Sequence, residues 1–342
     1  MSVMGTGNVE GIVVDLRGLL SKRRVRTKSF ARMMNLRLLR AIFAEFKGNF
    51  KHMSTGLRWL EWHGCPLKSL PNDFSLEKVA VLELSLSRLL EACIFDENFY
   101  RFYIGCIEDA LISADVANAV GCSNLQELPD SLGVMPRLEK LNLRYCQSLK
   151  TLPDSIGDKK RLSELYLTNV ALVQLPSSIG SLVELKGLWM FGYNKLKSLP
   201  DTLGHLMKLE KLDLSYCKSL KTLPPSVGSM KNLVELYFNF VDIKELPKSM
   251  GSLGFLQKLS LQGCNKLVVL PDGFDNLTNL EKLDLRGCSS FRKLPDSIGN
   301  MKSLTEILLA HTSIELLLDS LASIREAKRN TKLMNALKYL KA

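Results

Sequence analysis

One unit of a repeating pattern, LEKLNLRYCQSLKTLPDSIG at residues 138–157, decides how this chain folds. Its leucines follow the spacing L-x-x-L-x-L-x-x-C-x-x-L-x-x-L-P-x-S-I-G, and the Leu-Pro pair near its end recurs along the chain. From Pro129 to Pro295, the prolines of successive Leu-Pro pairs are 23 or 24 residues apart. Such regular spacing indicates that one structural unit is repeated through the second half of the sequence.

The leucine spacing within each unit is that of a leucine-rich repeat. In the L-x-L segment, both leucines point to one face of a short strand and the residue between them points to the other. A single unit cannot bury its leucine face, so neighbouring units must stack and share one continuous core. We therefore predict an α/β leucine-rich-repeat solenoid, a curved horseshoe with a parallel sheet on its concave side, built of roughly 11–12 repeats of about 23–24 residues.

The return segment of each repeat begins at the proline, which fixes φ and donates no backbone hydrogen bond. We expect Asp154 and Ser155 to cap a short helical turn, and Gly157 to end that turn with a positive φ. Asp275 stands where other repeats carry glycine. This departure predicts a looser turn in that repeat.

Composition and charge exclude several classes of protein. The 342 residues are 46% hydrophobic and 24% charged, as in globular proteins, and residues 1–10 lack the plan of a signal peptide. The net charge of +11 comes from the two ends, because residues 17–51 hold eleven lysines and arginines against one glutamate. A nucleic-acid-binding body would instead spread basic residues along one face. We expect the basic run at residues 22–26 to be a solvated loop, with a nuclear-import or phosphate-contacting patch as the alternative.

The cysteines follow the repeat and not the spacing of a metal site. No C-x-x-C occurs, and the predicted arrangement is a column of small buried thiols without disulfides. The sequence contains no phosphate loop, nucleophile elbow or zinc-binding helix motif, so we predict no catalytic residue, no metal ligand and no enzymatic activity. Four of the eight cysteines share one repeat position: Cys146, Cys217, Cys264 and Cys288.

The outward positions of the strands offer a candidate ligand-binding site on the concave face. Aromatic residues gather there in adjacent repeats among charged residues, a composition typical of protein-binding surfaces. Cross-strand aromatic residues can also serve only to stabilise a sheet. Trp189 and Phe191 favour binding, because they are expected to share one exposed face of a single strand. The candidate residues are Tyr166, Trp189, Phe191, Tyr237, Arg144, Tyr145, Tyr216 and Phe240.

The pattern also divides the chain into segments. Residues 1–29 are interpreted as a strand and a basic linker, and residues 30–90 as irregular first repeats. Residues 91–120 interrupt the repeat, either as a loop or as untranslated sequence wrongly joined to the protein. Residues 121–318 hold the regular repeats, and residues 319–342 are expected to form a helical cap on the solenoid.

Three segments in succession resemble a known family. Residues 5–16, 30–39 and 57–71 resemble the junction and first repeats of plant intracellular immune receptors that combine TIR, nucleotide-binding and leucine-rich-repeat domains. The Leu-Pro-Asp-Ser-Ile-Gly repeats are similar to those of the same class. The resemblance covers almost the whole chain except residues 91–120, and residues 1–29 resemble the end of a nucleotide-binding module.

The resemblance implies a function, a location and partners. In such receptors the repeats recognise a pathogen effector or a guarded host protein, and they hold the nucleotide-binding domain inactive until then. The chain would act in the cytoplasm, with the nucleus as an alternative. It would bind that domain of its own full-length protein, but neither membranes nor nucleic acid. No cofactor is expected, since ADP or ATP would bind only through a nucleotide-binding domain outside this sequence.

Two other functions remain open on the sequence alone. The first is a stand-alone intracellular scaffold or adaptor that mediates protein–protein interaction in signal transduction. The second is the ectodomain of a membrane receptor kinase. The second is disfavoured because Cys146 stands where such repeats usually carry asparagine, and because Leu-Pro-x-Ser-Ile-Gly replaces their Gly-x-Ile-Pro.

Overall fold

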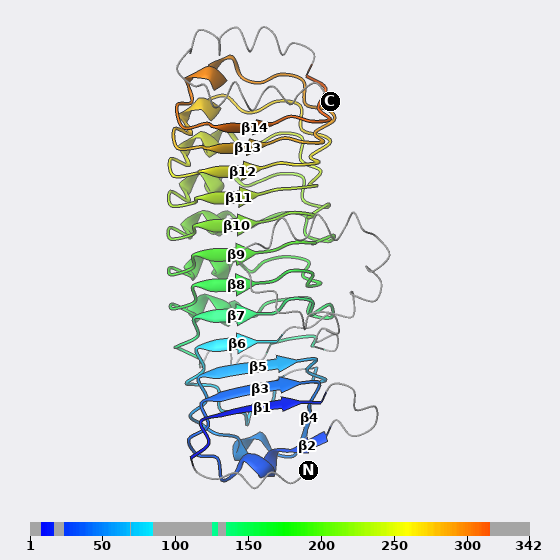
Figure 1. Cartoon of the computed structure of the whole chain (residues 1–342), viewed down its shortest axis with the longest axis vertical. Helices are drawn as coiled ribbons and strands as arrows, with labels where there is room; N and C mark the ends of the chain where they lie inside the picture. The colour runs from blue at the N-terminus through cyan, green and yellow to red at the C-terminus, as the bar shows by residue number, and fades with distance from the viewer. Residues whose placement is uncertain (1–7, 17–23, 69, 85–124, 129–134, 315–342) are drawn as a thin grey trace. The chain divides into compact units, whose positions relative to one another are not determined.

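The computed structural model describes residues 8–16, 24–68, 70–84, 125–128 and 135–314 (Figure 1). The chain forms two compact units. Unit 1 comprises residues 1–150 together with 169–171, and unit 2 comprises residues 151–168 and 172–342. The predicted interruption at residues 91–120 and the predicted C-terminal cap at residues 319–342 lie outside the described residues.

Unit 1 contains a parallel sheet in which the residue pairing follows the repeat. Leu39 of one strand pairs with Leu60 of the next, and Leu60 pairs with Leu82, so the buried leucines form one row. In order, the strands are β1 (Gly11–Asp15), β3 (Leu38–Ile42), β5 (Trp59–His63), β6 (Val81–Glu83) and β7 (Lys140–Asn142).

A second, two-stranded sheet in unit 1 corrects one prediction. Arg24–Arg26 is strand β2 and pairs in parallel with β4 (Glu45–Lys47), although we expected a solvated loop here. Arg24 Nε donates to Glu45 Oε2 at 3.1 Å, and Lys47 Nζ lies 2.7 Å from Glu45 Oε1. Glu45, the one acidic residue of this basic segment, therefore links β4 to β2 through its ion pair with Arg24. A short 3₁₀ helix follows each of these two strands: η1 (Thr27–Phe30) after β2 and η2 (Phe50–His52) after β4.

The core of unit 1 behind these strands is aromatic. Trp62 is fully buried and its indole Nε1 donates to the Ala44 carbonyl at 2.9 Å, so its one polar atom is satisfied. The ring of Phe46 packs edge-on against Trp62, with centroids 4.9 Å apart, and also against Phe30 and Phe50. These large rings fill the irregular first repeats, where the leucine pattern is incomplete.

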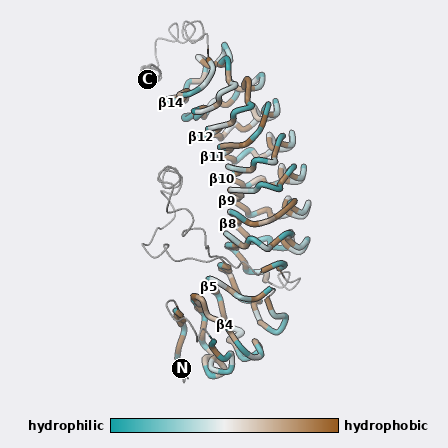
Figure 2. The backbone as a smooth tube through the Cα atoms, turned by 90° about the vertical axis from the view of Figure 1, so that its right-hand side faces the viewer, coloured by the Kyte–Doolittle hydropathy of each residue, from teal (hydrophilic) through white to brown (hydrophobic). Residues whose placement is uncertain are grey.

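Unit 2 holds the regular repeats as seven consecutive parallel strands (Figure 1). Each strand is three residues long with its central leucine or isoleucine buried, and apolar residues recur in every turn (Figure 2). The leucine-rich-repeat fold class is confirmed. The strands are β8 (Glu164–Tyr166), β9 (Gly187–Trp189), β10 (Lys211–Asp213), β11 (Glu235–Tyr237), β12 (Lys258–Ser260), β13 (Lys282–Asp284) and β14 (Glu306–Leu308).

The predicted helical turns are present as 3₁₀ helices, but their capping differs from the prediction. The residue before the first turn is Pro153, no side chain caps it, and Ser155 Oγ is buried without a hydrogen-bond partner among the described residues. The looser turn expected at Asp275 is found as the shortened η10, preceded by Gly273 at φ 75°. The turns are η5 (Asp154–Asp158), η6 (Ser177–Ser181), η7 (Asp201–His205), η8 (Pro225–Ser229), η9 (Lys248–Ser252), η10 (Phe274–Asn276) and η11 (Asp296–Asn300).

The glycines of the turns η5 to η9 serve a purpose that the sequence analysis assigned wrongly. Gly157 does not have a positive φ. Instead, a Cβ there would lie 2.7 Å from the Ser178 carbonyl oxygen of the following turn, and at Gly204 it would lie 2.3 Å from that of Ser226. Successive turns approach so closely that only a residue without a side chain fits. Glycine is required by packing and not by backbone conformation.

The column of buried cysteines is confirmed for those that the structure describes. Cys217 Sγ donates to the Met190 carbonyl at 3.3 Å, and Cys264 and Cys288 make the same bond to the preceding repeat at 3.0 Å. In another repeat the buried Tyr193 replaces cysteine, and its hydroxyl donates to the Leu167 carbonyl at 2.7 Å. Burial raises the pKa of the Cys217 thiol to about 12, which makes it inert at neutral pH.

We predict that Gly204→Ala destabilises the protein by about 1–3 kcal/mol, because the added methyl group overpacks the contact between η7 and η8. The free energy of unfolding measured in urea tests this. Gly254→Ala is the matched control, since a Cβ at Gly254 would meet no described atom within 4 Å. Equal stability of the two variants would show that the close approach of the turns is not limiting.

Candidate functional site

The exposed face of the unit 2 sheet carries a stacked pair of aromatic side chains. Tyr166 of β8 and Trp189 of β9 are register partners, and both side chains are partly exposed. Their ring centroids are 4.2 Å apart and their planes differ by 6°. The Tyr166 hydroxyl also donates to Glu164 Oε2 at 2.8 Å. The two rings, here called the Tyr166–Trp189 pair, are thus held in one orientation before any ligand is present.

The position of the indole depends on Gly187, which the sequence analysis did not single out. A Cβ on Gly187 would lie 2.1 Å from Cη2 of Trp189 and 2.4 Å from its Cζ3. The outer edge of the indole therefore lies over the glycine two residues earlier on its own strand. The signal was available in the sequence, because Gly187 occupies an outward position that holds lysine or glutamate in the other regular repeats.

A second aromatic group lies just beyond the strand ends. The ring centroids of Phe191 and Tyr216 are 4.7 Å apart, as are those of Tyr216 and Phe240. We call these three rings the aromatic ladder. The expectation that Trp189 and Phe191 share one strand face is wrong, since β9 ends at Trp189 and Phe191 stacks within the ladder instead.

Two residues of the ladder have left-handed backbone conformations. Tyr216 has φ 61° and Phe240 has φ 56°, values that residues with side chains rarely adopt. Their N–H groups donate to the carbonyls of Asn239 and Gln262 in the following repeats, both at 2.7 Å. The interstrand hydrogen bonding therefore continues past the strand ends, and the rings are fixed at its edge.

Tyr237 belongs to a charged neighbourhood on the same face. Its hydroxyl donates to Glu235 Oε2 at 3.1 Å. Glu235 also lies between Lys211 and Lys258, at 3.5 Å and 3.0 Å, on the two adjacent strands. Burial acts to raise the pKa of Glu235, but the hydrogen bond from Lys258 and the two lysine charges lower it overall.

Arg144 and Tyr145 belong to unit 1, whereas the other six predicted residues belong to unit 2. The Arg144 backbone N–H donates to Asn142 Oδ1 at 3.2 Å, and Tyr145 is left-handed with φ 63°, like Tyr216 with φ 61° in its own repeat. The eight predicted residues therefore divide between the two units. The Tyr166–Trp189 pair, the aromatic ladder and Tyr237 form the candidate surface.

One carboxylate on this surface was overlooked in the sequence. Asp213 of β10 is the register partner of Trp189 on one side and of Tyr237 on the other. Its Oδ1 accepts the backbone N–H of Ser215 at 2.9 Å. Burial raises the pKa of Asp213, and the hydrogen bonds from Ser215 offset this only in part. Nothing in its sequence context distinguishes it, because the flanking rings come from repeats 24 residues away.

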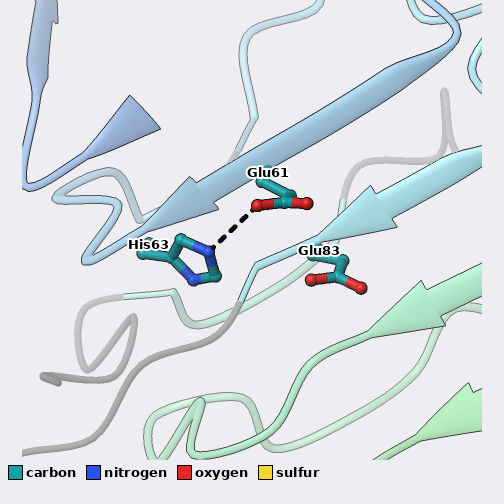
Figure 3. A group of neighbouring side chains, drawn as sticks. All are labelled: Glu61, His63 and Glu83. Atoms are coloured by element: carbon teal, nitrogen blue, oxygen red, sulfur yellow. Dashed lines mark ion pairs between the residues drawn. The ribbon is translucent and has the colours of Figure 1, made fainter. Parts of the chain in front are cut away.

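A candidate metal-binding group lies in unit 1, where Glu61, His63 and Glu83 place donor atoms within 4.8 Å of one another (Figure 3). These carboxylates already have cationic partners. Glu61 Oε2 lies 2.9 Å from Arg40 Nε and 3.4 Å from His63 Nε2, and Glu83 Oε1 lies 3.3 Å from Lys140 Nζ. A metal ion here would compete with Arg40 and Lys140 for these carboxylates, so this cluster is better described as an ion-pair network.

Comparison with known proteins shows which repeats these are similar to. The family model for the leucine-rich repeats of RPS4B-like disease resistance proteins matches residues 205–308. These leucine-rich repeats resemble those of plant disease resistance proteins. The disease resistance-like protein DSC1 of Arabidopsis thaliana is 29% identical over 163 residues, and the disease resistance protein RML1B of the same plant is 30% identical over 156 residues.

The similarity to disease resistance proteins covers part of each chain. It spans 40% of this chain, but only 13% of DSC1 and 15% of RML1B. Among solved structures, the leucine-rich repeat domain of the type III effector XopL matches 70% of this chain with a TM-score of 0.54 and 22% identity, over 90% of that chain. This likeness supports the fold alone.

No helix in the described part of the chain has both the length and the apolar character needed to cross a membrane.

We predict that Gly187→Ala displaces the indole and breaks the Tyr166–Trp189 pair, because the added methyl group would occupy the space of the ring. Loss of the stack should cost about 0.5–1.5 kcal/mol. It should also change the near-ultraviolet circular dichroism and the tryptophan fluorescence. Unchanged spectra would contradict the stacked arrangement, and Gly254→Ala again serves as control.

We predict that Asp213→Asn raises the melting temperature at pH 7, because it removes a charge that burial disfavours while keeping an acceptor for Ser215. Folding raises the pKa of Asp213 above its ordinary value of 3.8. The wild type therefore loses stability as the pH rises from that ordinary value through the raised pKa of the folded state. The difference between variant and wild type should therefore shrink as pH falls towards the ordinary value of 3.8. Asp284→Asn, which removes an ion pair with Arg286, should not stabilise.

Proposed function

We propose that this chain is the ligand-recognition module of a plant intracellular immune receptor, which senses a pathogen effector or a guarded host protein in defence signalling. The observation that carries the proposal is the surface of partly exposed, pre-stacked rings on the sheet of unit 2. The similarity to plant disease resistance proteins supports the immune context.

The rings of this surface are already ordered by stacking and are partly exposed, and both properties favour protein binding. Tryptophan and tyrosine are the residues that most often dominate binding energy at protein interfaces. Rings that are already stacked lose little conformational freedom on binding, so more of their contact energy contributes to affinity. Lys211, Glu235 and Lys258 beside the rings would form a polar rim. We propose a binding role without catalysis and without a cofactor.

The proposal extends to the protein as a whole. The chain spans less than a sixth of the length of the two relatives described, and we infer that the repeats restrain a nucleotide-binding domain until a ligand binds. The cytoplasm is the proposed location, with the nucleus as an alternative. A free-standing scaffold would use the same surface but would have no nucleotide-binding domain to restrain.

We predict that Trp189→Ala combined with Phe191→Ala removes partner binding and leaves the fold intact. The measurement is a pairwise interaction screen of the full chain against a library of pathogen effectors and plant proteins, repeated with the double variant. Partners of the wild type that bind the variant equally well would contradict the proposed site. Phe255→Ala is the control, since Phe255 is exposed but lies outside the candidate surface.

A further inference from the structure

The sheet face of unit 2 carries an aspartate at the same register position in two repeats. Asp213 ends β10 and Asp284 ends β13, and each accepts the backbone N–H of the residue two positions later. The two carboxylates differ in what else they contact. Asp284 has a cationic partner, which Asp213 lacks among the described residues.

Asp284 has a cation supplied by its own repeat. Arg286 lies two residues further on, with Nη2 2.6 Å from Asp284 Oδ2 and Nε 3.0 Å from Oδ1. This two-pronged contact of a guanidinium with a carboxylate is the strongest ion-pair geometry that proteins use. The charge of Asp284 is therefore neutralised within the repeat.

Asp213 differs from Asp284 in its hydrogen-bond partners. Ser215 stands in the place of Arg286, and among the described residues only Ser215 hydrogen-bonds to the Asp213 carboxylate. The lysine on the same strand, Lys211, pairs with Glu235 instead. Within the part of the chain that the structure describes, no lysine or arginine comes within ion-pair distance of Asp213. Its carboxylate is partly buried with its charge uncompensated by these residues.

Aromatic rings flank this carboxylate. Trp189 and Tyr237 are its register partners on β9 and β11. Tyr166 of β8 covers one face of the Trp189 indole. Since β8 and β10 lie on opposite sides of β9, the indole face that Tyr166 leaves uncovered is on the β10 side, where Asp213 is the register partner of Trp189 and Lys211 that of Gly187. A flat cation above Asp213 would contact the indole and the carboxylate together.

We propose that Asp213 and Trp189 form a receptor for an arginine side chain of the protein ligand, with the guanidinium paired to the carboxylate and stacked on the indole. This inference rests on the proposed protein-binding function and specifies its partner chemistry. The ligand guanidinium would form an ion pair with Asp213, as Arg286 does with Asp284. Arginine fits better than lysine, because a planar guanidinium forms two parallel hydrogen bonds while stacking on an aromatic face.

Binding would also remove the energetic penalty of the uncompensated charge. A partly buried carboxylate without a counter-ion is destabilising, and pairing it with a ligand cation relieves this. The same charge would disfavour ligands that present an acidic side chain at this point. The site would therefore select among ligands as well as hold them.

The test uses the side-chain N–H signals of the three tryptophans in ¹H–¹⁵N spectra of the full chain, with Trp189→Phe identifying the Trp189 signal. The probes are capped Gly-Arg-Gly and capped Gly-citrulline-Gly, which share a planar side chain but differ in charge. We expect millimolar Gly-Arg-Gly to shift the Trp189 signal and the citrulline peptide to leave it unchanged. Equal shifts with both peptides would overturn the proposal.

Three variants make the test specific. Asp213→Asn should weaken binding of Gly-Arg-Gly about tenfold or more, whereas Asp284→Asn should not. Ser215→Arg should place an internal guanidinium on Asp213, as in the Asp284–Arg286 pair, and block the probe. Retained probe binding by Asp213→Asn would refute the role of Asp213, and its near-isosteric change keeps the fold.

The failure of this inference is distinguishable from failure of the proposed function. If Asp213→Asn binds a protein partner as the wild type does, while Trp189→Ala with Phe191→Ala loses it, the surface binds protein but not through an arginine anchor. If both variants keep the partner, the surface itself is wrongly assigned. If both lose it and the arginine probe shifts Trp189, both proposals stand.

Discussion

The contact between one repeat and the next is the constraint on which the whole structure depends. A three-residue strand with one buried leucine, such as Leu212 in β10, has no core of its own. It gains one only if the next turn lies directly against it, and the glycines of the turns allow that approach. The stability of each repeat is therefore a property of its two interfaces.

The same constraint builds the candidate surface. Because stacked repeats pair their strands in strict register, residues about 24 apart in the sequence become lateral neighbours on the sheet face. Tyr166, Trp189, Asp213 and Tyr237 form one row in this way. The chemistry of the row is decided by single residues in separate repeats, each of which is free to vary while the leucines behind it stay fixed.

Much of the fold could be predicted from sequence, because leucine spacing reports burial directly. The repeat, the short strands, the cysteine column and the looser turn at Asp275 all followed from period and residue type. The role of Gly157 could not be predicted, since it depends on the distance to Ser178 in the next turn. Asp213 was missed for a similar reason: its environment is made by rings from neighbouring repeats.

The left-handed position after each strand has a consequence for how such a surface can change. Tyr216 and Phe240 occupy it in two repeats, and Gly263 and Gly287 occupy it in the next two with φ of 67° and 71°. The strain of placing a side chain there, about 1–2 kcal/mol, is offset by ring stacking of about 0.5–1.5 kcal/mol. The choice at one repeat depends on its neighbour, however, because a Cβ on Gly263 would lie 2.4 Å from Cδ1 of the Phe240 ring. A change of ring at this position therefore requires a matching change in the next repeat, while the leucine core behind both repeats stays the same.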